Sequence, residues 1–102
     1  MNSYIIVYDL RHFEKNYTSL YQAIKVNYPK WFHLTENSWV IFTDDSAKEI
    51  SQKIKNEFYY ENLYCDSFTV HKLDDSEGCC EGYAAKSFWE FLKENRNKEV
   101  EE

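Results

Sequence analysis

The sequence predicts a single α+β domain in which short strands and helices alternate. A chain of 102 residues is long enough for one hydrophobic core and too short for two. It holds nine tyrosines, seven phenylalanines and three tryptophans against two glycines and one proline, a composition typical of packed regular elements. Its apolar residues change spacing along the chain from the period of a strand to that of a helix and back.

The first two elements are a buried strand and an amphipathic helix. Residues 4–8, Tyr-Ile-Ile-Val-Tyr, are apolar on both faces, which predicts a central strand. The spacing then predicts a helix over 16–28, with Asn16 as N-cap and Pro29 as its stop. Its inward face has the helical spacing i, i+3, i+4, i+7, i+11, at Tyr17, Leu20, Tyr21, Ile24 and Tyr28.

A hairpin and a second helix follow. Two strand-like runs, 31–34 and 38–42, are separated by three residues, which favours an antiparallel pair. Ser46 and Glu49 then have the spacing of a capping box, in which each side chain bonds the backbone N–H of the other residue. The helix predicted over 46–58 buries Ala47, Ile50, Ile54 and Phe58.

The last strand and third helix are predicted from alternation and from a new helical stripe. Residues 64–73 alternate after Ser67, which is typical of a half-buried strand at or near a sheet edge. After the turn-rich residues 74–78, a helix is predicted from Tyr83 to about Glu94, with Ala84 or Ala85, Phe88, Phe91 and Leu92 facing inward. We expect this helix to pack across the sheet and to present the acidic residues Glu81, Glu90 and Glu94 outward, where they could bind a basic protein partner.

The element order is therefore β-α-β-β-α-β with an added C-terminal helix, the order of the ferredoxin-like split βαβ arrangement. It predicts a four-stranded antiparallel sheet in strand order 4-1-3-2 with the first two helices on one face. A simple meander is the alternative, but every gap that a hairpin cannot bridge holds a helix long enough to cross back. We expect one domain over 1–95 and a disordered tail over 96–102.

Charge and cysteine content limit the function classes. The net charge of −6 repels polyphosphates at long range. Residues 11–34 nevertheless carry four cations against one acid, so any phosphate-binding surface is expected there. Three cysteines, two of them adjacent, do not suggest a disulfide framework, and no apolar run approaches the ~20 residues of a membrane span. These features predict a soluble cytoplasmic protein without a membrane partner.

Two stretches carry a family resemblance. A first strand of the form YIIVYDL that ends in an acid, then a helix, a hairpin, a second helix and a last strand with DSFTV at 66–70, resembles the CRISPR-associated Cas-two proteins over 3–73. It is also similar to the related virulence-associated protein D toxins. The resemblance implies a homodimer, and it implies that Asp9 is the carboxylate assigned to metal-dependent cleavage of RNA or DNA in the members that cleave. Many members are instead structural halves of a DNA-integration complex.

A candidate metal site lies at the end of the first strand. In a 4-1-3-2 sheet, Asp9 and Asp66 should share one edge, with Glu36 in the nearby hairpin. Carboxylates with water can hold Mg²⁺ or Mn²⁺, and His12 is close enough in sequence to act as a general acid or base. Alternatively, these acids bond free backbone N–H groups and keep the sheet edge soluble.

Candidate nucleic-acid contacts lie in the cationic region. Lys25 and Lys30 flank the end of the first helix beside Trp31, which are the elements of a single-strand stacking site. Arg11 and Lys15 are the cations nearest Asp9 in sequence. In the alternative interpretation, Trp31 is a core residue and the lysines solvate the helix end.

Two functions from different classes therefore remain open. One is a metal-dependent endonuclease, a phosphodiesterase acting on RNA or DNA through Asp9. The other, which the acidic charge favours, is a non-catalytic dimeric module that binds a partner, such as an antitoxin-like inhibitor of a nucleic-acid enzyme. Any nucleic-acid binding is expected to be weak and sensitive to salt, because few cations can be grouped.

Overall fold

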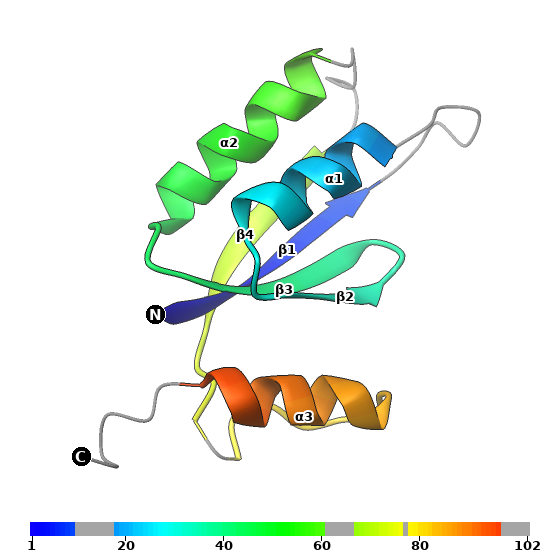
Figure 1. The fold of residues 1–102 in the computed structure, drawn as a ribbon, viewed down its shortest axis with the longest axis vertical. Coiled ribbons are helices and arrows are strands. Elements are labelled where there is room, and N and C mark those ends of the chain that lie inside the picture. Colours follow the sequence, from blue (N-terminus) through cyan, green and yellow to red (C-terminus); the bar gives the residue numbers. More distant parts are fainter. Residues whose placement is uncertain (10–17, 61–66, 77, 97–102) are drawn as a thin grey trace.

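The computed structural model describes residues 1–9, 18–60, 67–76 and 78–96. In that part of the chain it has four strands and three helices, arranged in three layers (Figure 1). Helices α1 and α2 lie on one face of the sheet, and α3 lies on the other (Figure 1). The elements are β1 (Asn2–Asp9), α1 (Thr18–Asn27), β2 (Trp31–Thr35), β3 (Ser38–Thr43), α2 (Ala47–Tyr60), β4 (Ser67–Leu73) and α3 (Lys86–Asn95).

The sheet is antiparallel throughout, and its strand order is β2-β3-β1-β4. Counted from the β4 edge, the same sheet reads 4-1-3-2, which is the order that the alternation of elements predicts. β1 is thus a central strand, paired with β3 on one side and with β4 on the other. The predicted α+β class with a four-stranded antiparallel sheet is confirmed.

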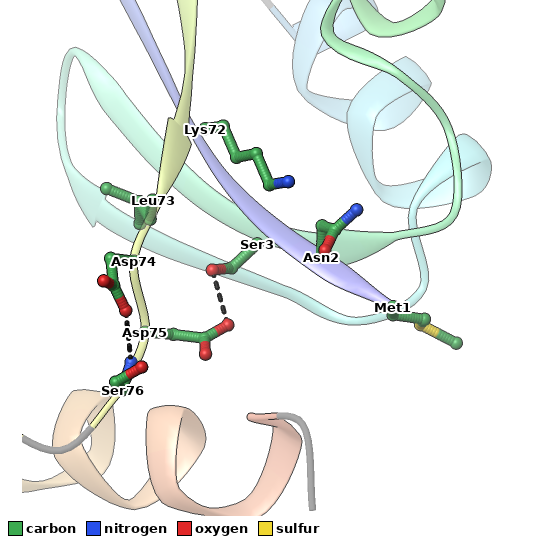
Figure 2. A pocket seen from close by; sticks show the side chains of 8 residues that line it. All are labelled: Met1, Asn2, Ser3, Lys72, Leu73, Asp74, Asp75 and Ser76. Atoms are coloured by element: carbon green, nitrogen blue, oxygen red, sulfur yellow. Dashed lines mark hydrogen bonds between the residues drawn. The ribbon is translucent and has the colours of Figure 1, made fainter. Parts of the chain in front are cut away.

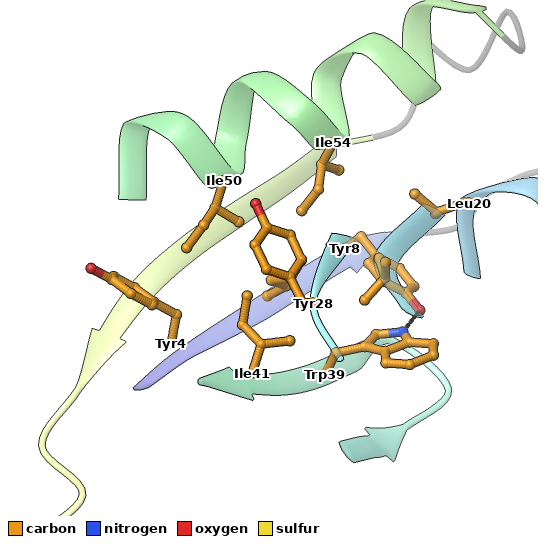
Figure 3. Packing of buried hydrophobic residues seen from close by; sticks show 10 residues of the cluster. Tyr4, Tyr8, Leu20, Tyr28, Trp39, Ile41, Ile50 and Ile54 are labelled. Atoms are coloured by element: carbon orange, nitrogen blue, oxygen red, sulfur yellow. Dashed lines mark hydrogen bonds between the residues drawn. The ribbon is translucent and has the colours of Figure 1, made fainter. Parts of the chain in front are cut away.

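The larger core fills the space between the sheet and the helices α1 and α2. Alternate residues of β1, namely Tyr4, Ile6 and Tyr8, point into it and are at most 4% exposed. Figure 3 shows how residues of α1, α2 and β3 close around them. The helices contribute Leu20, Ile24, Ile50 and Ile54, the residue after α1 contributes Tyr28, and β3 contributes Trp39 and Ile41.

A second, smaller core lies under α3. Phe88 and Leu92 are buried against Val40 and Phe42 of β3, and the Phe32 ring of β2 lies 5.3 Å from that of Phe88. The prediction that the third helix packs across the sheet is therefore confirmed. Because helices cover both faces over β2 and β3, these two strands are apolar on both sides rather than on one.

The start and the charge of α3 differ from the prediction. The helix begins at Lys86 rather than Tyr83, because Gly82 has φ +148° and Ala85 is extended, with ψ 144°. Within its bounds two lysines balance two glutamates, so the helix itself is not acidic. The acidic residues on this side of the protein, Asp74, Asp75 and Glu81, precede the helix.

The other bounds agree with the expected elements where the structure describes them. In β4, Phe68 and Val70 are half-buried while Thr69 and His71 are exposed, as the alternation predicts. The expected cap Asn16, the Phe58 side chain, residues 64–66 and residues 97–102 lie outside the described part of the chain. Among the described helices, none has the length and apolar character of a membrane span.

The capping box of α2 forms as the sequence predicts. The Glu49 backbone N–H donates to Ser46 Oγ over 3.1 Å, and the Ser46 N–H donates to Glu49 Oε1 over 3.0 Å. These bonds satisfy two backbone donors that the helix itself cannot pair. The start of α2 is thus fixed by its own sequence rather than by distant contacts.

We expect Ser46→Ala to lower the free energy of unfolding by about 1 kcal/mol, because it removes the acceptor for an end-of-helix N–H. Urea denaturation measures the difference. Ser87→Ala is the control, since Ser87 is an exposed serine in the first turn of α3. Equal effects of the two substitutions would show that the cap does not stabilise the fold.

Candidate nucleic-acid interface and the Asp9 edge

The end of α1 and the start of β2 bring a cation and an indole together. Helix α1 stops at Asn27 and β2 starts at Trp31, so the short connection folds the last turn of the helix back over the strand. Lys25 Nζ lies 4.9 Å from the centroid of the Trp31 ring, in cation–π contact. Lys30 precedes Trp31 and is exposed, and it lines a separate hollow with Pro29 and Phe42. Of the three predicted contact residues, Lys25 and Trp31 are thus in contact, while Lys30 lines a different hollow.

Trp31 rests on a layer of aromatic rings. Its ring centroid lies 5.3 Å from that of Trp39, which is fully buried. His33 stacks on Trp39 at 4.1 Å with an interplanar angle of 9°, and Tyr21 of α1 packs against both rings. Trp31 itself is half-buried. It is therefore both a core residue on its inner side and a surface residue on the side that Lys25 covers.

A buried hydrogen bond fixes this layer to the centre of the sheet. Trp39 Nε1 donates to the Tyr8 hydroxyl over 2.6 Å (Figure 3). Burial raises the pKa of Tyr8, so its hydroxyl stays protonated and neutral. In the same layer the buried His33 Nε2 has no hydrogen-bond partner among the described residues. In this layer the Trp39 N–H is therefore satisfied, whereas His33 Nε2 is not.

Asp9 lies at the far end of β1, at the edge of the sheet where the β2–β3 hairpin turns. Its Cα is paired with that of Ser67 in β4, and the preceding N–H, of Tyr8, donates to Asn37 O over 2.9 Å. This places the hairpin loop, with Glu36, near the end of β1, as expected. Asp9 is exposed and takes part in a hydrogen-bonding or electrostatic interaction within the protein.

The other predicted members of the Asp9 site lie outside the described residues. These are the catalytic candidate His12, the metal candidate Asp66 and the phosphate contacts Arg11 and Lys15. Within the described ranges, no three histidine, cysteine or acidic side chains are grouped so that they could hold a metal ion. The described part of this edge therefore holds Asp9, with Glu36 in the nearby hairpin, but no group of three such ligands.

The strand register separates Asp9 from the cation–aromatic pair. Trp31 and Tyr4 are both paired with Ile41, so Trp31 is level with the start of β1. Asp9 is five residues further along β1 than Tyr4, which is about 17 Å at the rise of an extended strand. The two candidate sites, at Asp9 and at Lys25 with Trp31, thus lie at different levels of the sheet.

Sequence reasoning missed two hollows on either side of Asp75 and Ser76. One, of about 470 Å³, lies where β4 passes the start of β1. There Ser3 Oγ donates to Asp75 Oδ2 over 2.7 Å (Figure 2). The Ser76 hydroxyl and N–H hold the pKa of Asp74 below its usual range.

The second hollow, of about 330 Å³, lies between this turn and α3. The sequence of residues 74–78 indicated only a turn. The sequence could have indicated this hollow through the helical spacing of an indole and two cations. These are Trp89 and Lys93 of α3 and Arg96 at its C-cap, on the side next to the turn.

The chain was also compared with known proteins. No family model matches its sequence, and no curated protein is significantly similar to it. The resemblance to Cas-two proteins therefore rests on the two short stretches in which it was found.

We expect Tyr8→Phe to lower the free energy of unfolding by about 1–3 kcal/mol, because it leaves the Trp39 N–H buried without an acceptor. Urea denaturation measures the loss. The matched control is Tyr4→Phe, since Tyr4 is equally buried on the same face of β1, at 4% exposure against 3%. A Tyr4→Phe effect as large as that of Tyr8→Phe would assign the loss to packing rather than to the hydrogen bond.

Proposed function

We propose that this chain is a Cas-two-like protein of ferredoxin-like topology that acts as a non-catalytic, homodimeric interaction module. The topology is supported by the order of elements and by the sheet order read from β4. The position of the two crossover helices, α1 and α2, on one face of the sheet agrees with this topology (Figure 1). The family is part of the proposal because the first and last strands resemble those of Cas-two proteins.

The observation that carries the non-catalytic role is the separation of Asp9 from Lys25 and Trp31. Cleavage of a phosphodiester needs metal-binding carboxylates and charge-stabilising cations around the same phosphate. Among the described cations that the sequence assigns to nucleic acid, Lys25 with Trp31 lies level with Tyr4, about 17 Å along β1 from the strand-end carboxylate. Asp9 already interacts within the protein, which supports a structural role at the end of β1.

The proposed dimer forms through the β4 edge. The other edge strand, β2, has five residues, and its register shifts between His33 and Thr35. Short and irregular edges resist pairing with another sheet. In contrast, β4 has seven residues paired with β1 without a shift, so its outer side is a regular template for another strand.

A second copy of β4 fits this edge by symmetry. If a twofold axis passes Val70, antiparallel pairing sets Thr69 opposite His71 of the second copy and Phe68 opposite its Lys72. No two like charges then stand directly opposite one another, and the two sheets form one continuous sheet. Self-complementarity of this kind favours a second copy over an unrelated strand.

Nucleic acid is a secondary partner in this proposal. Lys25 and Trp31 offer one cation for a phosphate and one ring for stacking, and Lys30 is a second exposed cation next to Trp31 in sequence. The net charge of −6 opposes association, and each phosphate contact is weakened by salt. Binding at this surface is therefore weak and is lost at modest salt concentration.

The catalytic alternative is tested with Asp9→Asn, which keeps the shape of the side chain and removes its charge. Native and variant protein are incubated with single-stranded RNA and duplex DNA in Mg²⁺ or Mn²⁺. We expect no cleavage by either protein, and a loss of about 1 kcal/mol in the free energy of unfolding of the variant, because a hydrogen-bonding or electrostatic interaction is weakened. Cleavage by the native protein that the variant lacks would overturn the non-catalytic role and establish the nuclease.

The dimer is tested by light scattering on size-exclusion fractions. The native chain should have twice the monomer mass of 12.4 kDa. Thr69→Lys should reduce it to the monomer, because the new lysines of the two copies would stand diagonally across the interface on the same face of the sheet, where their charges repel. Gln52→Lys, which adds the same charge on the exposed side of α2, should remain dimeric. A native monomer, or a dimeric Thr69→Lys variant, would contradict the β4 interface.

A further inference from the structure

The hollow between α3 and the turn after β4 is walled by one stripe of the helix. Trp89, Leu92 and Lys93 of α3 line it together with Arg96, the C-cap of the helix, and their spacing is i, i+3, i+4, i+7. The opposite wall consists of Asp75, Ser76, Gly78 and Cys80 from the turn. Its volume of about 330 Å³ falls within the range of small-molecule sites in proteins.

The helix stripe changes from aromatic to cationic along its length. Trp89 is half-buried, and its ring packs 5.0 Å from that of Phe88, which holds the indole in place. Leu92 is buried beneath the middle of the hollow. Lys93 is exposed and Arg96 is half-buried at the other end, where the Arg96 N–H donates to Leu92 O over 2.9 Å.

The charges of the described lining favour an anion. The lining residues that the structure describes include two cations and one carboxylate, Asp75, which already accepts a hydrogen bond from Ser3. The C-terminal end of a helix favours cations by itself, so the positions of Lys93 and Arg96 alone would not indicate a ligand site. They lie, however, on the same stripe as an indole and across from a hydroxyl and a carboxylate, and the helix end does not explain that combination.

We propose that this hollow binds a nucleotide, that is, a planar ring joined through a sugar to a phosphate. The ring stacks on Trp89, and the phosphate is bound by Lys93 and Arg96. The Ser76 hydroxyl and the Asp75 carboxylate lie on the opposite wall, where sugar hydroxyls can bond them. The ligand is either a free nucleotide or the phosphorylated end of a strand, which share this chemistry.

Backbone geometry keeps the opposite wall open. Gly78 has φ +88°, and a Cβ built there would have no heavy atom within 4 Å. The neighbouring hollow beside β1 shares Asp75 and Ser76 but has no aromatic ring in its lining, so it offers no stacking surface. The nucleotide is therefore assigned to the α3 side. This site depends on neither Asp9 nor the β4 edge, and it stands apart from the proposed function.

Nuclear magnetic resonance of the three indole N–H groups tests the site in the native chain. Adenosine monophosphate is titrated, with adenosine and ribose 5-phosphate as probes that lack the phosphate or the ring. We expect the Trp89 resonance, assigned through Trp89→Phe, to shift with adenosine monophosphate at lower concentrations than with either fragment. The resonances of Trp31 and the buried Trp39 should stay in place. A shift confined to Trp31, or no shift at millimolar concentration, would overturn the proposal.

Two variants locate the phosphate. Lys93→Gln should weaken binding of adenosine monophosphate about three- to fivefold, the effect of one partly exposed charge contact. Lys86→Gln removes the same charge from the first turn of α3, outside the hollow, and should leave the affinity unchanged. Equal affinities for the two variants would refute the site.

A comparison of a 5′-phosphorylated oligonucleotide with adenosine monophosphate then identifies the source of the ligand. Tighter binding of a 5′-phosphorylated strand than of adenosine monophosphate, with the same loss in Lys93→Gln, assigns the site to strand ends. Binding of the nucleotide alone assigns it to free nucleotides. If Lys93→Gln does not weaken the ligand that binds, the site is elsewhere and the proposal fails.

Discussion

The position of β1 between two strands and two helical layers is the constraint on which the rest of the structure depends. It is paired over its length with β4 and over most of it with β3. Its alternate side chains supply the larger core, while Ser3 is buried and Ile5 packs against the core under α3. Because side chains alternate strictly along a strand, a slip of one residue would exchange the two faces. One strand thus sets the register for both cores.

The helical layer over β1 is held by polar contacts at its margin as well as by apolar packing. The Tyr28 hydroxyl at the end of α1 donates to Asp45 Oδ2 over 3.1 Å, and Lys53 Nζ of α2 donates to the same oxygen over 2.8 Å. The Lys53 ammonium holds the pKa of Asp45 below its usual range, so the carboxylate is ionised at neutral pH. One side chain just before α2 therefore connects both helices.

The features that the sequence predicted correctly depend on residues that are close together in the chain. The Ser46–Glu49 pair forms the capping box of α2 within four residues. In β4 the alternation of apolar and polar residues corresponds directly to which side chains are half-buried and which are exposed. The start of α3 was wrong by three residues because the backbone conformations of Gly82 and Ala85, which end the preceding turn, have no periodic signal.

The candidate sites were less predictable than the fold because they depend on register. Lys25 and Trp31 are six residues apart, and their contact follows from the short turn between α1 and β2. That Trp31 lies level with Tyr4, far from Asp9, follows only from the pairing of both residues with Ile41. The hollow beside α3 requires the packing of two segments that the sequence separates by a turn.

The incomplete cover of the outer face explains why the two sheet edges differ. The core under α3 draws on Phe32 and Leu34 of β2 and on Val40 and Phe42 of β3. Near the other edge, Val7 of β1 is 39% exposed, and Thr69 and His71 of β4 are exposed. The β2 edge is therefore enclosed by a helix on each face, whereas β4 has helical cover on one. Because an added strand must approach an edge with little steric obstruction, the placement of α3 on the β2–β3 half directs any pairing to β4.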